Sequence, residues 1–247
     1  MSGDIDSVAS TNLTAVLRAQ GFAFLGGIET RRKLELFRDD TFAEWPAFAA
    51  SWNDLVVDVY LAEHGRFRRR RHAIFQVPRS GLPRRLPQRP HFQSLLYNSL
   101  QGGIERWFEP MSTAVGDSPI LQAIFAFMCE SFGPLSQHVQ SWYAEVHQFR
   151  IEAKAGEPGQ PTPEGVHRDG VDYVLVLLVR RENILSGTTT VHALDGTMLG
   201  QFTLTVPFDA ALLVDECVAH GVTPVLPEDP GASAYRDVLV VTFRAEE

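Results

Sequence analysis

The stretch TTTVHALDGTMLGQFTLT, residues 188–205, decides how the second half of the chain must fold. Asp195 and Gly196 lie at its centre, and an Asp-Gly pair suits a tight turn that needs positive φ angles. On either side of this pair, residues 188–193 and 198–205 are rich in Thr, Val, Leu and Phe, which favour strands. The stretch therefore predicts a β-hairpin.

Four further segments of the second half have the same strand-like composition. They are short, rich in Val, Thr, Leu and Phe, and separated by turn residues; they cover residues 143–151, 173–179, 211–215 and 238–243. No helical pattern lies between them, which argues against a parallel sheet built from βαβ units. Several short strands at close spacing predict an all-β sandwich or barrel instead.

The first half of the chain mixes helical and irregular segments. Apolar residues at helical spacing predict helices over residues 11–20, 44–60 and 119–132. Four prolines within residues 77–90 predict an extended loop there. The most basic stretch, RFRRRRH at residues 66–72, is expected to be a strand whose arginines pair with acidic neighbours.

The composition excludes several classes of protein. The chain has 247 residues, of which 45% are hydrophobic, so it can build a core of ordinary size. Its net charge of −8 argues against general binding to nucleic acid or to an anionic membrane. Two cysteines exclude a disulfide scaffold and a zinc site built from thiolates. No apolar run reaches 18 residues and the N-terminal region lacks a signal-peptide pattern, so a cytoplasmic location is expected.

A candidate metal site begins in the sequence PTPEGVHRDG, residues 161–170. His167 and Asp169 stand two positions apart, and on an extended chain such residues point to the same side. His220 follows about fifty residues later, a separation that several strands can bridge in a closed β architecture. Two imidazoles and one carboxylate on one face of a metal are the ligand set of non-haem Fe(II) oxygenases. We therefore predict a catalytic metal held by these three residues.

Arg236, at the head of the last predicted strand, completes this scheme. A guanidinium binds a carboxylate through two parallel hydrogen bonds. 2-Oxoglutarate needs a metal for its keto-acid end and a cation for its distal carboxylate, and the metal and Arg236 would supply both. Arg244 is the competing anchor, but it lies close to the chain terminus and is expected to be solvated.

Three other polar side chains are candidates for the cavity. Side chains alternate along a strand, so Gln148 and Arg150 share one face of the strand that precedes the metal motif. We expect this polar face to line the cavity and Gln148 to contact the co-substrate. A solvated sheet face is the alternative. Glu164, just before the metal motif, can either meet a substrate ammonium group or lie in a rigid surface loop.

Several stretches together resemble the Fe(II)/2-oxoglutarate-dependent dioxygenase family that includes bacterial L-isoleucine 4-hydroxylases and related free-amino-acid hydroxylases. The resemblance covers about the C-terminal two thirds of the chain. It lies in YNSLQGGIERWFEP (97–110), HQFRI (147–151), PTPEGVHRDG (161–170), HGVTPV (220–225) and YRDVLVVTF (235–243).

The resemblance implies a mainly β fold with flanking helices (α+β), in which N-terminal helices pack outside a double-stranded β-helix, or jelly-roll, core of the cupin-like type. It implies Fe(II) on His167, Asp169 and His220, 2-oxoglutarate on Arg236, and O2 as the oxidant. We expect one domain, residues 1–247, with a metal-binding core at 141–247 and a helical, substrate-selecting support at 1–140.

The function that the resemblance implies best is hydroxylation of the side chain of a free L-amino acid. Two alternatives remain open from the sequence: a cupin-type metalloenzyme that does not use 2-oxoglutarate, and a metal-binding stress or biofilm protein without turnover. A small-molecule partner is expected, and neither nucleic acid nor membrane. A homodimer is left open.

Overall fold

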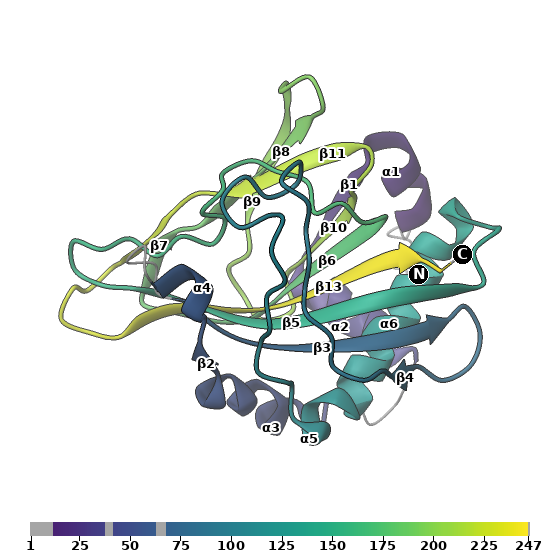
Figure 1. Ribbon diagram of the computed structural model, residues 1–247, viewed down its shortest axis with the longest axis horizontal. Helices are drawn as coiled ribbons and strands as arrows, with labels where there is room; N and C mark the ends of the chain where they lie inside the picture. The colour runs from purple at the N-terminus through teal and green to yellow at the C-terminus, as the bar shows by residue number, and fades with distance from the viewer. Residues whose placement is uncertain (1–11, 38–41, 63–67, 247) are drawn as a thin grey trace, which may run out of the picture.

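A mainly antiparallel β architecture with helices on one side is the fold of this chain (Figure 1). The computed structural model describes residues 12–37, 42–62 and 68–246. Its helical segments are α1 (Leu13–Gln20), α2 (Gly27–Glu35), α3 (Trp45–Ala50), η1 (Ser51–Asp54), α4 (Val59–Ala62), α5 (Thr113–Gly116), α6 (Pro119–Phe132) and η2 (Gly133–Leu135).

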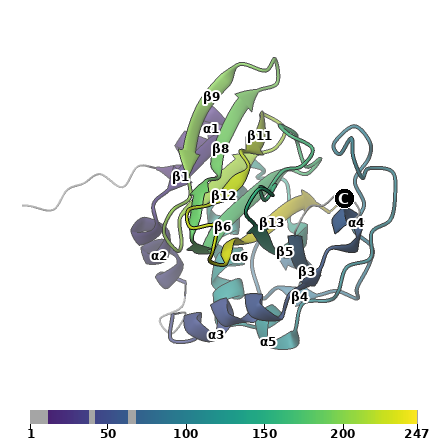
Figure 2. The ribbon, with the colours of Figure 1, turned by 90° about the vertical axis from the view of Figure 1, so that its left-hand side faces the viewer.

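Seven strands follow one another side by side in the large sheet, in the order β1 (Phe22–Leu25), β10 (Ala210–Val214), β6 (Tyr173–Glu182), β13 (Ala234–Ala245), β5 (Ser141–Ala153), β3 (Arg68–Pro78) and β2 (Val56–Val57). The short β4 (Arg84–Arg85) adds to β3. A small sheet contains β11 (Val218–Val222), β8 (Thr188–Ala193) and β9 (Met198–Thr203), and β12 (Val225–Pro227) pairs with β7 (Ile184–Ser186). Figure 2 shows the small sheet standing above the large one.

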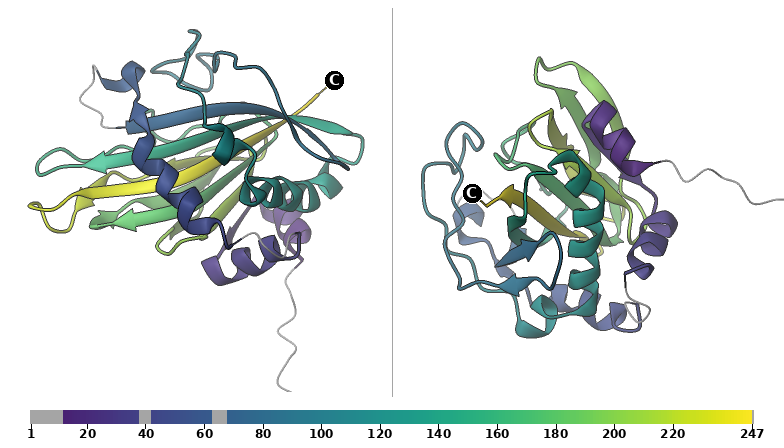
Figure 3. Two further views of the ribbon diagram at one scale, coloured as in Figure 1. Left: turned by 90° about the horizontal axis from the view of Figure 1, so that it is seen from below. Right: turned by 90° about the vertical axis from the view of Figure 1, so that its right-hand side faces the viewer.

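Alternation along the strands gives the large sheet two chemically different faces. On β5, Trp142, Ala144 and Val146 are buried in the main hydrophobic core. The same core takes in α1, α2, α3 and α6, which lie across this outer face of the sheet (Figure 3). The odd-numbered residues of β5 point to the opposite, inner face, as a period of two requires. That inner face is covered by the small sheet rather than by helices.

Local sequence signals explain the segments that were predicted correctly. The helix predicted at 119–132 is confirmed: the Ser118 side chain accepts a hydrogen bond from the Leu121 amide, and Pro119 occupies the first turn, where its missing N–H costs nothing. The hairpin at 188–205 is also confirmed, as β8 and β9, and Gly196 at its turn has a φ of 90°. The other four predicted strands correspond to β5, β6, β10 and β13.

The helix predicted over residues 44–60 is confirmed only in its first part: α3 covers Trp45–Ala50, the 3-10 helix η1 continues to Asp54, and the rest is not part of that helix. The helix tightens into η1 after Ala50, and within η1 Trp52 is buried beneath the sheet, where its indole N–H donates to the Phe149 carbonyl at 3.1 Å. Val56 and Val57 then pair with β3 as an edge strand, in keeping with the β preference of branched residues. A helical pattern of apolar residues was therefore overridden by tertiary packing.

The first half of the chain contributes more than helices. β1, β2 and β3 all belong to the large sheet, so a boundary at residue 140 does not divide the sheet from its support. The predicted basic strand is β3 from Arg68 onward, while Arg66 and Phe67 lie outside the described residues. No helix among the described residues is both long and apolar enough to span a membrane.

Candidate metal centre

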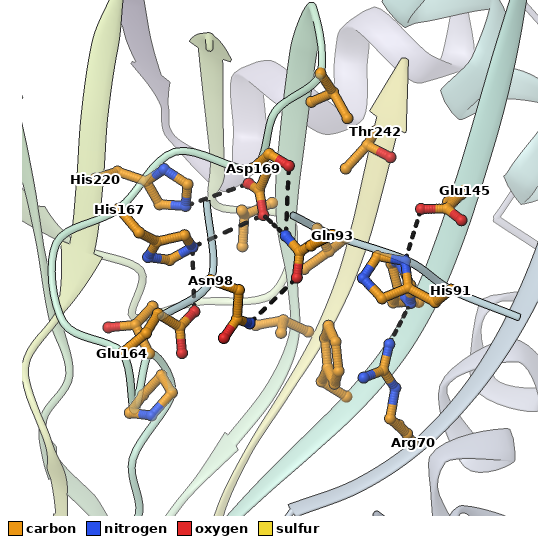
Figure 4. Close-up of a pocket in the computed structure, with 18 of the residues that line it drawn as sticks. Arg70, His91, Gln93, Asn98, Glu145, Glu164, His167, Asp169, His220 and Thr242 are labelled. Carbon is orange, nitrogen blue, oxygen red and sulfur yellow. Dashed lines mark hydrogen bonds and ion pairs between the residues drawn. The ribbon is translucent and has the colours of Figure 1, made fainter. Parts of the chain in front are cut away.

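A cavity of about 380 Å³ lies against the inner face of the large sheet. Alternate residues of β5 and β13 form its floor, Thr189 and His220 of the small sheet contribute to its walls, and residues of the 90–106 segment close it (Figure 4). All three predicted metal ligands and Arg236 line this one cavity. The two sheets therefore enclose a space that joins the residues singled out in the sequence.

The three predicted metal ligands converge on one point. His167 and His220 are paired through their backbones, with N···O distances of 2.9 and 2.8 Å in the two directions. Their Nε2 atoms lie 3.7 and 3.8 Å from the two carboxylate oxygens of Asp169. One ligand atom from each of the three residues lies within 4.8 Å of the others, close enough for a single cation.

Two of the three ligands already have the protonation state that a divalent metal takes, and the third, His167, would release a proton on binding it. Burial lowers the pKa of His167, but Asp169 and Glu164 outweigh this and raise it to about 9. The Nδ1 atom of His167 donates to the Gly165 carbonyl at 3.0 Å, which leaves its Nε2 atom to face the site. Burial raises the pKa of Asp169, but the neighbouring His167 and His220 outweigh this and lower it to about 2. Burial lowers the pKa of His220 to about 4, so its imidazole is neutral. An ionised carboxylate and imidazole nitrogens are the donors that Fe(II) takes in such sites, so the residues fit the metal.

Asp215, at the end of β10, holds the loop that carries Asp169. Its Oδ1 atom accepts a hydrogen bond from the Asp169 amide at 2.9 Å, and its Oδ2 atom accepts from the Gly170 and Val171 amides at 2.8 and 3.2 Å. Sequence reasoning missed this residue, because only the folded chain brings its carboxylate beside the metal motif. The loop is thus held by hydrogen bonds from its backbone amides to the Asp215 carboxylate rather than by the ladder of a regular strand.

Replacing Asp215 by alanine is expected to weaken Fe(II) binding by about 10- to 100-fold, the usual cost of losing a group that orients metal ligands. Anaerobic Fe(II) titration measures this. Asp209→Ala is the matched control, since Asp209 is also buried and accepts three backbone N–H groups, from Gly27, Thr205 and Val206, away from the cavity. Equal iron affinities in the two variants would contradict the role of Asp215.

Arg236 lies on the floor of the cavity, and its charge is unpaired within the described residues. The residue is 2% exposed, and its Nε and Nη2 atoms have no hydrogen-bond partner. Within the described ranges no carboxylate lies at ion-pair distance from it. Burial lowers its pKa to about 10, which still leaves the guanidinium charged at neutral pH. An unpaired buried cation in this cavity fits the distal carboxylate of 2-oxoglutarate. Arg244, in contrast, is exposed, with its guanidinium 5.0 Å from the Tyr143 ring.

Gln148 was expected at the cavity, and the structure places it elsewhere. The strand alternates as predicted, but the cavity-lining face of β5 carries His147 and Glu145. Gln148 points to the helix side, where its amide donates to the Ser51 hydroxyl at 2.9 Å. Arg150 shares that side and pairs with Asp237 at 2.7 Å. The polar face was misassigned because these partners, distant in sequence, satisfy it within the outer layer.

A second group of four side chains was not foreseen: His72, His91, Glu145 and His147, whose candidate ligand atoms also lie within 4.8 Å. Internal hydrogen bonds already engage it, since His91 contacts Glu145 at 2.8 Å and Arg70 donates to Nδ1 of His147 at 2.6 Å. Burial, followed by the charge of Arg70, lowers the pKa of His147 well below its usual value. The positive surroundings disfavour a metal cation, and we interpret the group as a hydrogen-bonded part of the cavity wall.

The basic stretch behaves as predicted. Arg68 pairs with Asp58 at 2.7 Å, Arg69 with Glu152 at 2.7 Å, and Arg71 with Glu109 at 3.6 Å. These arginines are therefore neutralised by acidic neighbours within the fold.

Comparison with known proteins gives a consistent result. The model of the 2OG-Fe dioxygenase family matches residues 49–242. The chain is 26% identical to the 3(1)-hydroxy-L-isoleucine 4-dioxygenase of Pantoea ananatis (strain AJ13355), over 94% of each protein. It is 29% identical to the L-isoleucine-4-hydroxylase of Bacillus thuringiensis over 160 residues, which cover 64% of this chain and 66% of that enzyme.

Among solved structures, a BsmA homologue from Methylobium petroleophilum PM1 is similar with a TM-score of 0.83 and 39% identity. The match covers 96% of this chain and 92% of that one. The mainly antiparallel sheets described above therefore have a counterpart along almost the whole chain.

Proposed function

This chain belongs to the 2OG-Fe dioxygenase family, and on that premise we propose that it hydroxylates the side chain of a free aliphatic L-amino acid. We further propose that His167, Asp169 and His220 hold the Fe(II) and that Arg236 anchors 2-oxoglutarate. The observation that carries this assignment is the single cavity that joins the three convergent ligands to a buried arginine without a carboxylate partner in the described chain.

As a member of this family, the protein is an Fe(II)- and 2-oxoglutarate-dependent dioxygenase. Together, Fe(II), 2-oxoglutarate and O2 oxidise the substrate while 2-oxoglutarate loses CO2 and becomes succinate. The protein's own contribution is to position the ligands, to neutralise the co-substrate carboxylate and to enclose the reaction. With three protein ligands, a bound Fe(II) would keep positions open for 2-oxoglutarate and O2.

The substrate class is supported by two relatives named as dioxygenases or hydroxylases of isoleucine or its hydroxy derivative. A cavity of about 380 Å³ accommodates molecules of the size of 2-oxoglutarate and a small amino acid. Charged groups remain in it beyond those needed for the metal and the co-substrate, as expected for a zwitterionic ligand.

The proposal is tested by mixing the protein anaerobically with Fe(II) and 2-oxoglutarate, recording the visible charge-transfer band, and then adding O2 with each proteinogenic L-amino acid. We expect succinate in excess of the reaction without amino acid, and a product heavier by one oxygen atom in mass spectrometry. Aliphatic amino acids should give the largest excess.

A band without any amino-acid-dependent succinate would overturn the substrate assignment while leaving the enzyme class intact. Absence of the band in protein shown to contain iron would overturn the assignment of the co-substrate site and favour a metal-binding role without turnover.

A further inference from the structure

Most of the charged groups at the Arg68–Arg70 end of the cavity are paired with a group of opposite charge. The carboxylate of Asp58 lies 2.7 Å from Arg68 and 3.5 Å from Arg70, so one anion serves two arginines. Glu145 is engaged by His91 at 2.8 Å, and its pKa is held well below the usual value despite burial. Each of these charged groups has at least one partner of opposite charge within the fold, although Nε of Arg70 makes no hydrogen bond. Arg106 and Glu164 remain to be considered.

Arg106 is a buried cation without a matching anion. Its side chain lines the cavity and is 2% exposed. Its Nη1 and Nη2 atoms donate to the side-chain oxygens of Gln101 at 2.9 Å and Gln93 at 2.8 Å, and its Nε atom has no partner. Across residues 12–37, 42–62 and 68–246, no carboxylate lies within ion-pair distance of it. Two neutral amides orient this guanidinium but do not balance its charge, and a guanidinium carries five N–H donors.

Glu164 is the complementary anion. It lines the same cavity, beside His167 in Figure 4, and its carboxylate lies 3.3 Å from Nε2 of His167. Because Nδ1 of His167 is committed to the Gly165 carbonyl, Nε2 is the atom available to a metal. Once that nitrogen binds iron, Glu164 has no other hydrogen-bond or ion-pair partner in the described parts of the chain, and it presents its charge to the cavity.

The two groups belong to one region near the metal. Gln93, which accepts the hydrogen bond from Arg106, also reaches the Asp169 carbonyl at 3.4 Å and accepts from Asn98 at 3.2 Å (Figure 4). Arg106 is thus one side chain away from a predicted iron ligand. Burial lowers the pKa of Arg106, and the negative charge of Glu164 is close enough to oppose this.

The geometry points to a head-group subsite for the primary substrate, in which Arg106 binds the α-carboxylate and Glu164 the α-ammonium of a free amino acid. This inference builds on the function proposed above and specifies which residues select a zwitterion. The amino-acid side chain is then directed to the metal, and Arg236 remains reserved for 2-oxoglutarate. Charge-assisted hydrogen bonds of this kind are strong where water is excluded.

The test measures binding rather than turnover, by calorimetry on enzyme loaded with Fe(II) and 2-oxoglutarate without O2. The amino acid with the strongest binding is compared with its decarboxylated amine and its deaminated acid; for L-isoleucine these are 2-methylbutylamine and 3-methylpentanoate. The variants are Arg106→Gln and Glu164→Gln. Arg244→Gln is the control, because this arginine also borders the cavity but is exposed.

We expect Arg106→Gln to raise the dissociation constants of the amino acid and the acid by about 100-fold and to leave that of the amine nearly unchanged. Glu164→Gln should weaken the amino acid and the amine by about 10-fold or more and spare the acid. A general disturbance of the 90–106 segment would weaken all three probes equally, so the selectivity itself reports the contacts.

If the amino acid binds wild type and both variants alike, or if each variant weakens the three probes equally, the head-group subsite is wrong and the proposed function stands. If no free amino acid binds the wild type but the deaminated acid does, then both the proposed function and the role of Glu164 are wrong. Retention of the 2-oxoglutarate band in every variant shows that the co-substrate site is intact.

Discussion

Asp169→Ala is expected to abolish amino-acid-dependent succinate formation and to weaken Fe(II) binding by more than about 100-fold, since the loss of merely orienting groups already costs 10- to 100-fold. Asp169 contributes the only carboxylate among the three convergent ligands. Its removal leaves two imidazoles to hold a dication without a compensating negative charge. Both losses should therefore appear together.

Equilibrium dialysis under argon measures the iron affinity of this variant, and mass spectrometry measures succinate. Asp195→Ala serves as the matched control, because Asp195 lies fully exposed at the β8–β9 turn and is not among the residues that line the cavity. An Asp169→Ala protein that binds one iron as tightly as the control would show that the metal lies elsewhere.

The parts of the fold that could be predicted are those with local sequence signals, such as a helix cap or a turn dipeptide. The 119–132 helix has its Ser118 cap and its proline in the first turn, and the 188–205 hairpin has its Asp-Gly turn, so both have sequence signals independent of their surroundings. The strand that carries His220 was not predicted. Its sequence VAHGV is short, and a histidine and a glycine interrupt the apolar run. Its antiparallel ladder with β8 and its single bridge to His167 form only in the folded chain.

The site shows the same limit. The two-residue spacing of His167 and Asp169 implies a common side on any extended chain, so their convergence was predictable. Which face of β5 meets the cavity was not, because that depends on Ser51 and Asp237, which satisfy the opposite face. The support from Asp215 was likewise invisible, since its three hydrogen bonds join segments more than forty residues apart.

Arg236→Gln is expected to raise the dissociation constant of 2-oxoglutarate by about 100-fold, the cost of removing one partner of a buried charge pair. Iron affinity should be unchanged, and the ligand-free protein should be as stable as wild type or more so, because the variant removes a buried, unpaired charge. Anaerobic titration of the charge-transfer band measures the dissociation constant of 2-oxoglutarate, and thermal unfolding without co-substrate measures the stability.

Arg244→Gln and Gln148→Ala are the matched controls. The first removes the exposed arginine and the second removes the amide on the opposite face of the sheet. In both, the dissociation constant of 2-oxoglutarate should stay within about twofold of wild type. A larger loss in Arg244→Gln than in Arg236→Gln would move the anchor to the end of β13 and reverse the direction in which the co-substrate lies across the cavity floor.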